Sequence, residues 1–294
     1  MVRQDLPNSY GCTRESRGIE MAKGKVMSNA EYRKTEGISS TELKKIAKSP
    51  AHYKYYKENP MEDTPALLFG RAAHKYVLET YDFYNEFAVA PVCDRRTKEG
   101  KETWNKFVAD SEGKDVITQE QFEQIDAMRN AMLATPFVSK LINGEHEVSF
   151  FWTDEETGLK CKVRPDVLNR NLKIIVDYKT TEDAETEAFK KSAIRYCYDL
   201  QAYMYQQGVK ANIGEEYLFV FIAQEKKPPY AVNILEADGN FMASGKHIFR
   251  EMLNVYKECS ESGNWYGYLG SKNEINSLGV PKWMEQLLES EDEE

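Results

Sequence analysis

Residues 164–181 have the sequence RPDVLNRNLKIIVDYKTT, and this stretch decides the fold. Its apolar run IIV is typical of a strand that is buried on both faces in the middle of a sheet. The run continues into Asp177, Tyr178 and Lys179. Because successive side chains of a strand alternate, Asp177 and Lys179 share one face and Tyr178 lies on the other. Asp166 follows a proline at the end of the preceding strand, so pairing of the two strands places Asp166 beside Asp177.

Two carboxylates held this close repel each other unless a cation lies between them. Hard oxygen ligands suit Mg²⁺ or Mn²⁺. The ammonium group of Lys179, on the face of Asp177, could orient or deprotonate an attacking water or neutralise a phosphate oxygen. The alternative is an ordinary surface salt bridge at a strand end, but the apolar run before Asp177 indicates a buried strand, where an unpaired Asp and Lys would be costly.

Three further polar residues have positions that suit the same site. Gln201 and Tyr205 are four residues apart on a predicted helix and therefore share one of its faces. His74 lies on another predicted helix, between Arg71 and Leu78, and could complete a metal shell.

The rest of the chain divides into helical and extended segments. Ser39 with Glu42, and Thr118 with Gln121, form capping boxes that predict two helix starts. We expect helices over 39–49, 67–79, around Trp104 and Phe107, and over 118–136, then strands over 83–91, 147–153, 159–168 and 172–181, a helix over 187–208, strands over 217–223 and 230–237, and a helix over 238–262. The strands between 147 and 181 form a three-stranded meander in this prediction. The order predicts an α/β fold with a central mixed sheet flanked by helices.

The composition bounds the class of protein. The chain has 294 residues, of which 41% are hydrophobic and 30% charged, enough apolar material for one large or two small cores and too much for a disordered chain. No apolar run approaches the roughly 18 residues of a membrane span, and the N-terminus has no apolar signal segment, so we expect a cytoplasmic protein. The five cysteines include no CxxC pair, which argues against a disulfide framework and a four-cysteine metal site.

The charge is unevenly distributed. The net charge is −9, but residues 285–294 hold six carboxylates and no base, so residues 1–284 carry only −3, from 42 acidic and 39 basic groups. Residues 285–294 are therefore predicted to form an acidic C-terminal tail, a segment separate from the folded domain. Residues 1–36 have no sustained apolar period, and we expect them to form a second such segment. It is a flexible N-terminal arm that is disordered or ordered only by a partner.

The motifs resemble a known superfamily. Pro165-Asp166, Asp177-x-Lys179 and Gln201-x-x-x-Tyr205 resemble the PD-(D/E)xK nucleases, and His74 with the Gln/Tyr pair is similar to the RecB-type branch. The segments EVSFFW, CKVRPD, DYKTT and ISSTELKKIAKSPAHYKYYKENP, with Phe69-Gly70, are similar to the C-terminal nuclease domain of RecE-type exonucleases (exonuclease VIII) and phage relatives. The resemblance covers residues 37–284 and implies a restriction-endonuclease-like core.

The resemblance also implies an activity. The protein would be an ATP-independent 5′-to-3′ exodeoxyribonuclease that uses Mg²⁺, with Mn²⁺ as a substitute. Acting on the ends of linear double-stranded DNA, it would expose 3′ single strands for a single-strand-annealing recombinase of the RecT-like kind. Relatives of this type form rings, so a trimeric or tetrameric homo-oligomer in a bacterial or phage-infected cell is implied.

The resemblance assigns roles residue by residue. The implied metal ligands are His74, Asp166, Asp177 and the Tyr178 carbonyl group. The implied catalytic residues are Lys179, which would activate water, together with Asp166, Asp177 and Glu147, the last of which would bind a second metal or support the first. The implied DNA-binding residues are Gln201, Tyr205, Arg71, Arg95, Arg96 and Lys98.

Two alternatives remain open. One is a non-catalytic DNA-end or protein-binding module of the same fold, against which the intact His74, Asp166, Asp177 and Lys179 weigh. The other is a structure-selective or restriction-type endonuclease, which shares the site and differs only in the topology of the DNA that it cuts.

Overall fold

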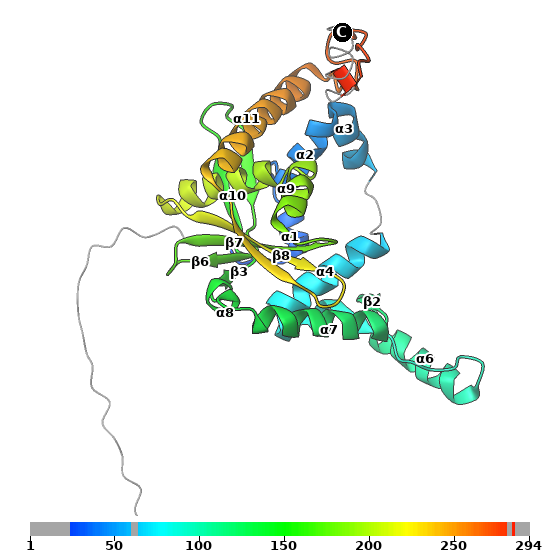
Figure 1. Cartoon of the computed structure of the whole chain (residues 1–294). Coiled ribbons are helices and arrows are strands. Elements are labelled where there is room, and N and C mark those ends of the chain that lie inside the picture. Colours follow the sequence, from blue (N-terminus) through cyan, green and yellow to red (C-terminus); the bar gives the residue numbers. More distant parts are fainter. Residues whose placement is uncertain (1–23, 60–63, 281–283, 286–294) are drawn as a thin grey trace, which may run out of the picture.

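A five-stranded mixed sheet forms the centre of the protein. The computed structural model describes residues 24–59, 64–280 and 284–285. The sheet has the order β3 (Glu145–His146), β6 (Val167–Asn169), β7 (Ile174–Thr181), β8 (Leu218–Glu225) and β9 (Val232–Glu236) (Figure 1). β7 and β8 are parallel, and the other neighbours are antiparallel. The predicted α/β class with a central mixed sheet is confirmed.

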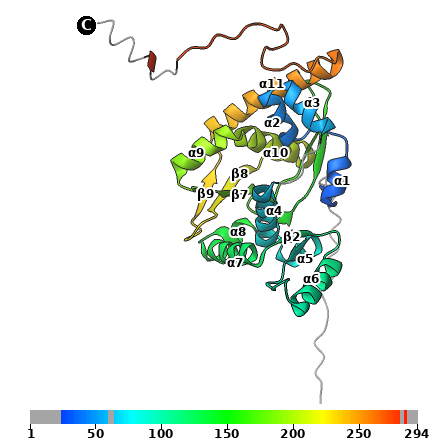
Figure 2. The same ribbon diagram turned by 90° about the vertical axis from the view of Figure 1, so that its right-hand side faces the viewer.

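Helices cover both faces of this sheet (Figures 1 and 2). Alternate residues of β7 belong to different cores: Ile175 packs in the cluster that contains Leu200, and Val176 in the cluster that contains Val77. This is why the run before Asp177 is apolar at every position. The helices nearest the first cluster are α2 (Ser40–Lys48), α3 (Pro50–Glu58), α9 (Thr186–Arg195), α10 (Tyr198–Ile213) and α11 (Gly239–Ser262), and those on the opposite face are α4 (Pro65–Leu78), α7 (Gln119–Ala134) and α8 (Val138–Leu141).

The predicted helix starts are confirmed. Ser39 and Glu42 form a capping box at the start of α2, and Thr118 and Gln121 form one at the start of α7. The hydroxyl group of Thr64 caps α4. Each cap accepts a backbone N–H that the first helical turn leaves without a partner.

The predicted three-stranded meander is wrong in its middle strand. The segment divides at Pro165 into β5 (Lys160–Val163) and β6. β5 pairs with β4 (Phe150–Thr153) in a separate two-stranded sheet, whereas β6 pairs with β7. Proline has no backbone N–H to donate, so it ends one ladder and allows the chain to enter another. Asp166 therefore lies at the junction of the two sheets.

The predicted helix over 187–208 is two helices. α9 ends at Arg195 and α10 begins at Tyr198. Between them Cys197 has a φ of 50°, a left-handed conformation that no continuous α-helix contains. The break turns the chain so that α10 runs along the sheet.

The strand predicted over 83–91 is reduced to β1 (Phe87–Val89), which is parallel to β2 (Asp115–Ile117). The residues before it form η1 (Thr80–Asp82) and α5 (Phe83–Glu86), because Phe83 stacks on Phe87 with ring centroids 5.1 Å apart in the core under α4. Between β1 and β2 the helix α6 (Lys98–Asp110) extends away from the body (Figures 1 and 2).

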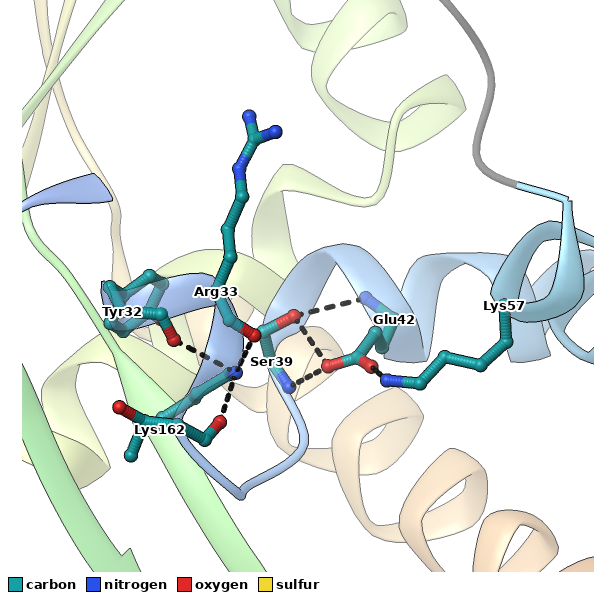
Figure 3. Close-up of polar contacts among 7 residues, drawn as sticks. Tyr32, Arg33, Ser39, Glu42, Lys57 and Lys162 are labelled. Atoms are coloured by element: carbon teal, nitrogen blue, oxygen red, sulfur yellow. Dashed lines mark hydrogen bonds and ion pairs between the residues drawn. The ribbon is translucent and has the colours of Figure 1, made fainter. Parts of the chain in front are cut away.

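Part of the expected N-terminal arm has structure of its own. Residues 29–34 form α1 (Asn29–Lys34), and Lys25 bridges to Ser149. The buried ammonium group of Lys162 donates hydrogen bonds to the carbonyl groups of Tyr32 (3.1 Å), Arg33 (3.3 Å) and Thr35 (2.7 Å), which holds the end of α1 (Figure 3). The expectation of an unstructured arm therefore differs from the structure over 24–36. Residues 1–23 and 286–294 lie outside the described residues, and the boundaries at 37 and 284 stay predictions.

No helix in the described part of the chain is both long enough and apolar enough to cross a lipid bilayer.

Replacing Lys162 by Met is expected to release α1. The change removes the donor to three carbonyl groups, and bonds to charged groups contribute roughly 1.5–3 kcal/mol each before the cost of burying the ammonium group. Hydrogen exchange should become faster across residues 29–35. Lys160→Met is the matched control, because Lys160 pairs with the exposed Glu36 at the surface and its loss should change stability by only about 0.5 kcal/mol. Equal exchange in both variants would contradict the role given to Lys162.

Candidate active site

Three ligand-bearing side chains converge where β3, β6 and α4 meet. His74 comes from α4, Glu147 directly follows β3, and Asp166 directly precedes β6. Nε2 of His74 lies 3.0 Å from Oδ2 of Asp166, and Nδ1 of His74 lies 3.9 Å from Oε1 of Glu147. One ligand atom from each residue can be chosen so that all lie within 4.8 Å of one another. The structure thus brings together two of the predicted metal ligands and the predicted supporting glutamate.

Glu147 is held in a strained conformation. Its φ is 52°, in the left-handed region that residues other than glycine rarely adopt. Its N–H donates to the carbonyl oxygen of Asp166 at 3.1 Å, and Oε2 lies 2.6 Å from Nε of Arg164. These two contacts direct the carboxylate toward His74.

Asp177 and Lys179 form a second, more buried group beside the first. Asp177 is fully buried; its Oδ2 lies 2.6 Å from Nζ of Lys179, and its Oδ1 accepts a 2.6 Å hydrogen bond from the side-chain amide of Gln201. The oxygen of that amide accepts a 2.7 Å hydrogen bond from Nζ of Lys44. Four side chains from α2, β7 and α10 are thus linked in one polar chain.

The electrostatics of the first group favour a bound cation. Burial raises the pKa of Glu147 to about 7, and the charge of Asp166 adds to this. Burial alone would lower the pKa of His74, but the charge and hydrogen bond of Asp166 outweigh it and raise the pKa to about 9. In the metal-free protein a proton on His74 therefore compensates the carboxylates.

The second group shows the same competition. Burial raises the pKa of Asp177 to about 6 although Lys179 opposes the shift, and the charge of Asp166 raises it further. The pKa of Lys179 is above its usual value, because Asp177 and Asp166 outweigh the effect of burial. The pKa of Lys44 is lowered to about 7 by burial and by the charge of Lys179.

The donor set fits a divalent metal ion. His74, Glu147 and Asp166 offer one imidazole nitrogen and carboxylate oxygens. Carboxylate oxygens suit hard divalent ions, and an imidazole nitrogen is a common ligand of divalent transition metals. Asp177, which we expected as a ligand, has one oxygen on Lys179 and the other on Gln201. Its assignment as a ligand stays a prediction.

The two tyrosines singled out by the sequence have different surroundings. The backbone N–H of Tyr178 donates to Oδ2 of Asp166 at 2.8 Å, while its hydroxyl group donates to the buried Gln224 on the opposite face, at 2.7 Å. Tyr205 lies near Ser40 of α2, and burial and the nearby charge of Asp177 raise its pKa. Contact of Tyr205 with substrate stays a prediction.

Of the four basic residues implied to bind DNA, one lies beside the ligand group. Arg71 lines the pocket beside His74 and pairs with Asp115 at 2.5 Å. The other three lie just before or at the start of α6, which extends away from the sheet (Figures 1 and 2), and their contact with DNA stays a prediction. Their neighbours there are local: Arg95 stacks on Trp104, Arg96 pairs with Asp94, and Lys98 lies near Glu102. The sequence could not show that α6 projects from the body (Figures 1 and 2).

His74 and Glu147 of the ligand group line a pocket of about 750 Å³. Residues 26–30 form one wall of this pocket, and His74, Glu147 and Arg164 line another part. The guanidinium group of Arg164 lies 5.6 Å from the ring of Tyr32 in α1. The N-terminal segment is therefore part of the site.

Sequence reasoning missed Lys44, Arg164 and Tyr32. Arg164 precedes the Pro-Asp pair, so its place beside the site had a signal in the sequence. Lys44 and Tyr32 had none, because each reaches the site only through the packing of α2 or α1 on the sheets.

One protein family matches most of the chain. The PDDEXK-like domain of unknown function (DUF3799) matches residues 39–276. The structure is similar to that of a "Putative exonuclease" from Eubacterium rectale, with a TM-score of 0.60 and 17% identity over 90% of this chain and 98% of that chain. A phage-related exonuclease from Haemophilus somnus 129PT shares 12% identity over 80% of this chain and 100% of that chain, with a TM-score of 0.34. No curated protein matches the chain.

We expect the metal-free protein to lose stability as the pH rises from about 5 to 9. Folding raises the pKa of Glu147 from its usual 4.5 to about 7, and that of Asp177 from 3.8 to about 6. The contribution of each protonated carboxyl group to the free energy of unfolding is therefore fully present below its usual pKa, and is lost as the pH rises through its raised pKa. The stability from protonated His74, complete below pH 6.5, is lost through about pH 9. Thermal unfolding in EDTA measures this.

At pH 8, Mg²⁺ should then raise the melting temperature, because a ligand that binds only the folded state stabilises it. Asp166→Asn should reduce this response, since it removes a charge from the donor set. Equal stabilisation of the wild type and of this variant by Mg²⁺ would show that the ion binds elsewhere.

Proposed function

The chain belongs to the PDDEXK-like domain family, and from this premise we propose that it is a metal-dependent exodeoxyribonuclease. Family membership and the shared fold support nuclease activity. The finer assignment is digestion of linear double-stranded DNA from 5′ to 3′, with Mg²⁺ and without ATP, to leave 3′ single strands for annealing recombination. It is supported by the resemblance of the motifs to RecE-type exonucleases.

One observation carries the proposal. The ligand group of His74, Glu147 and Asp166 lies next to the buried Asp177–Lys179 pair, close enough for the charge of Asp166 to shift the pKa values of both members of that pair. A structural ion pair needs neither a second cluster of carboxylates nor a strained Glu147 beside it. The non-catalytic alternative leaves both features without a purpose.

The residues of the chain suggest how the reaction proceeds. A divalent ion held by His74, Glu147 and Asp166 would lower the pKa of bound water and withdraw charge from the phosphate. Lys179 keeps its proton, because its pKa is raised, so its ammonium group acts by orienting water and stabilising the negative charge that develops on phosphate oxygen. Asp177 and Gln201 hold Lys179 in place.

Partners and assembly are part of the same proposal. We propose DNA ends as the substrate, a RecT-like annealing recombinase as the partner that receives the 3′ strand, and a ring of three or four copies that encloses the duplex. These assignments rest on the resemblance alone.

Lys179→Ala should reduce cleavage of linear duplex by about 100-fold or more, the range found for removing one group that stabilises a transition state. Lys190→Ala is the control, because this lysine is exposed on α9 and pairs only with Glu187 among the described residues. Both proteins should show folded circular dichroism spectra. Unchanged turnover by a folded Lys179→Ala protein would refute the assigned role.

The topology of the DNA distinguishes the three functions. With Mg²⁺ and no ATP, the exonuclease should degrade 5′-labelled linear duplex to mononucleotides and leave covalently closed plasmid intact, because terminal base pairs separate more readily than internal ones. EDTA should abolish the reaction. Nicking of the closed plasmid at a comparable rate would favour the endonuclease, and end binding without any product would favour the non-catalytic module.

A further inference from the structure

A surface of aromatic and basic residues continues from Lys179 away from the ligand group. The ring of Tyr198 has two ammonium groups over it, Nζ of Lys179 at 4.9 Å from the centroid and Nζ of Lys44 at 4.8 Å. The ring of Tyr196 follows, with its centroid 5.9 Å from that of Tyr198. The guanidinium carbon of Arg195 lies 5.7 Å from the centroid of Tyr196. Two neighbouring rings therefore lie between the two ammonium groups and the guanidinium group of Arg195.

Tyr196 contributes little to the core. It is 53% exposed, although tyrosine is a large and partly apolar residue. It stands just before Cys197, whose left-handed backbone separates α9 from α10. Because the helices break here, the rings of Tyr196 and Tyr198 lie on the same side of the chain and near each other.

The two rings line a groove of about 260 Å³. Thr180 and Thr181, which directly follow Lys179 in β7, line it as well. The groove thus lies at the carboxy-terminal end of β7. Its volume is below the roughly 300–1,000 Å³ of pockets for drug-sized ligands, which suits a single flat ring system.

We propose that this groove binds one nucleobase of the substrate strand, stacked on Tyr196. This proposal rests on the proposed nuclease function, and it describes how the protein binds the DNA strand that is cleaved. Aromatic rings interleaved with cations are the usual means of binding single-stranded nucleic acid, because every base has a face that can stack. The phosphate groups on either side of this base lie toward Lys44 and Lys179 in this arrangement.

The charges of the groove favour a base over a phosphate as its occupant. Glu182 and Asp183 line it, and Glu182 is paired with Lys226. Carboxylates repel a phosphate group, whereas they and the threonine hydroxyl groups can accept hydrogen bonds from the amino groups of a neutral base. Lys226 also lines the groove, but its ammonium group is paired with Glu182. Lys44 and Lys179, whose ammonium groups lie over the ring of Tyr198, are not among the residues that line it.

Tyr196→Ala should weaken binding of a single-stranded oligonucleotide of about 15 nucleotides by roughly 5- to 150-fold, because stacking on one aromatic residue contributes about 1–3 kcal/mol. Fluorescence anisotropy in EDTA measures the Kd without cleavage. Tyr196→Phe retains the ring and should bind within about twofold of the wild type. Since Tyr196 is exposed, neither change should affect folding, which melting temperatures verify.

Tyr55→Ala is the matched control. Tyr55 is 60% exposed on α3 and has Tyr56 as its ring neighbour at 5.9 Å, with the ammonium group of Lys45 over Tyr56. It repeats the chemistry of the Tyr196 pair at a place that does not line the groove. Tyr55→Ala should leave the Kd unchanged.

An abasic probe tests whether the contact is to a base. Removing single bases in turn along the oligonucleotide should identify one position whose loss weakens wild-type binding, and on that probe Tyr196→Ala should cause no further loss. If Tyr196→Ala and Tyr55→Ala both bind like a wild type that cleaves DNA, the groove is not a base site and only this inference fails. A wild type that neither binds nor cleaves DNA would overturn the proposed function as well.

Discussion

The buried ion pair between Asp177 and Lys179 is the constraint on which the rest of the structure depends. Burying an isolated charge in a protein interior is costly, so both charges must be paired and hydrogen-bonded within the central strand β7. The protein meets this requirement with Gln201 from α10, which is itself held by Lys44 from α2. The helices on this face therefore do more than cover the apolar residues of β7, because they also complete the polar contacts of Asp177.

The division of the predicted meander has a comparable consequence. Because the chain changes sheets at Pro165, Asp166 is free to accept hydrogen bonds from His74 and from the backbone of Tyr178 at the same time. The same junction places Arg164 between Glu147 and Tyr32. A continuous strand would have placed these residues in a regular ladder, and the N-terminal segment would have had no contact with the ligand group.

The two sides of Lys179 differ in chemistry. On one side lie the carboxylates and His74, where negative charge accumulates until a proton or a metal ion compensates it. On the other side lie Lys44, Tyr198 and Tyr196, where positive charge is interleaved with aromatic rings. When a phosphodiester reacts at the first side, the bases and phosphate groups next to it must also be bound. The aromatic rings on the second side can stack on bases, and its positive charges can pair with phosphate groups.

The sequence by itself determined the α/β class, the capped starts of α2 and α7, and the placing of Asp177 and Lys179 on one face of a buried strand, because local periodicity and capping depend on neighbouring residues only. Its motifs also indicated His74, Asp166 and Gln201. The tertiary structure alone decided that Pro165 divides two sheets, that Cys197 divides two helices, and that the start of α6 lies far from the ligand group. It also placed Lys44 and α1 at the site, since contacts between residues distant in the chain follow from how the elements pack, which no local pattern encodes.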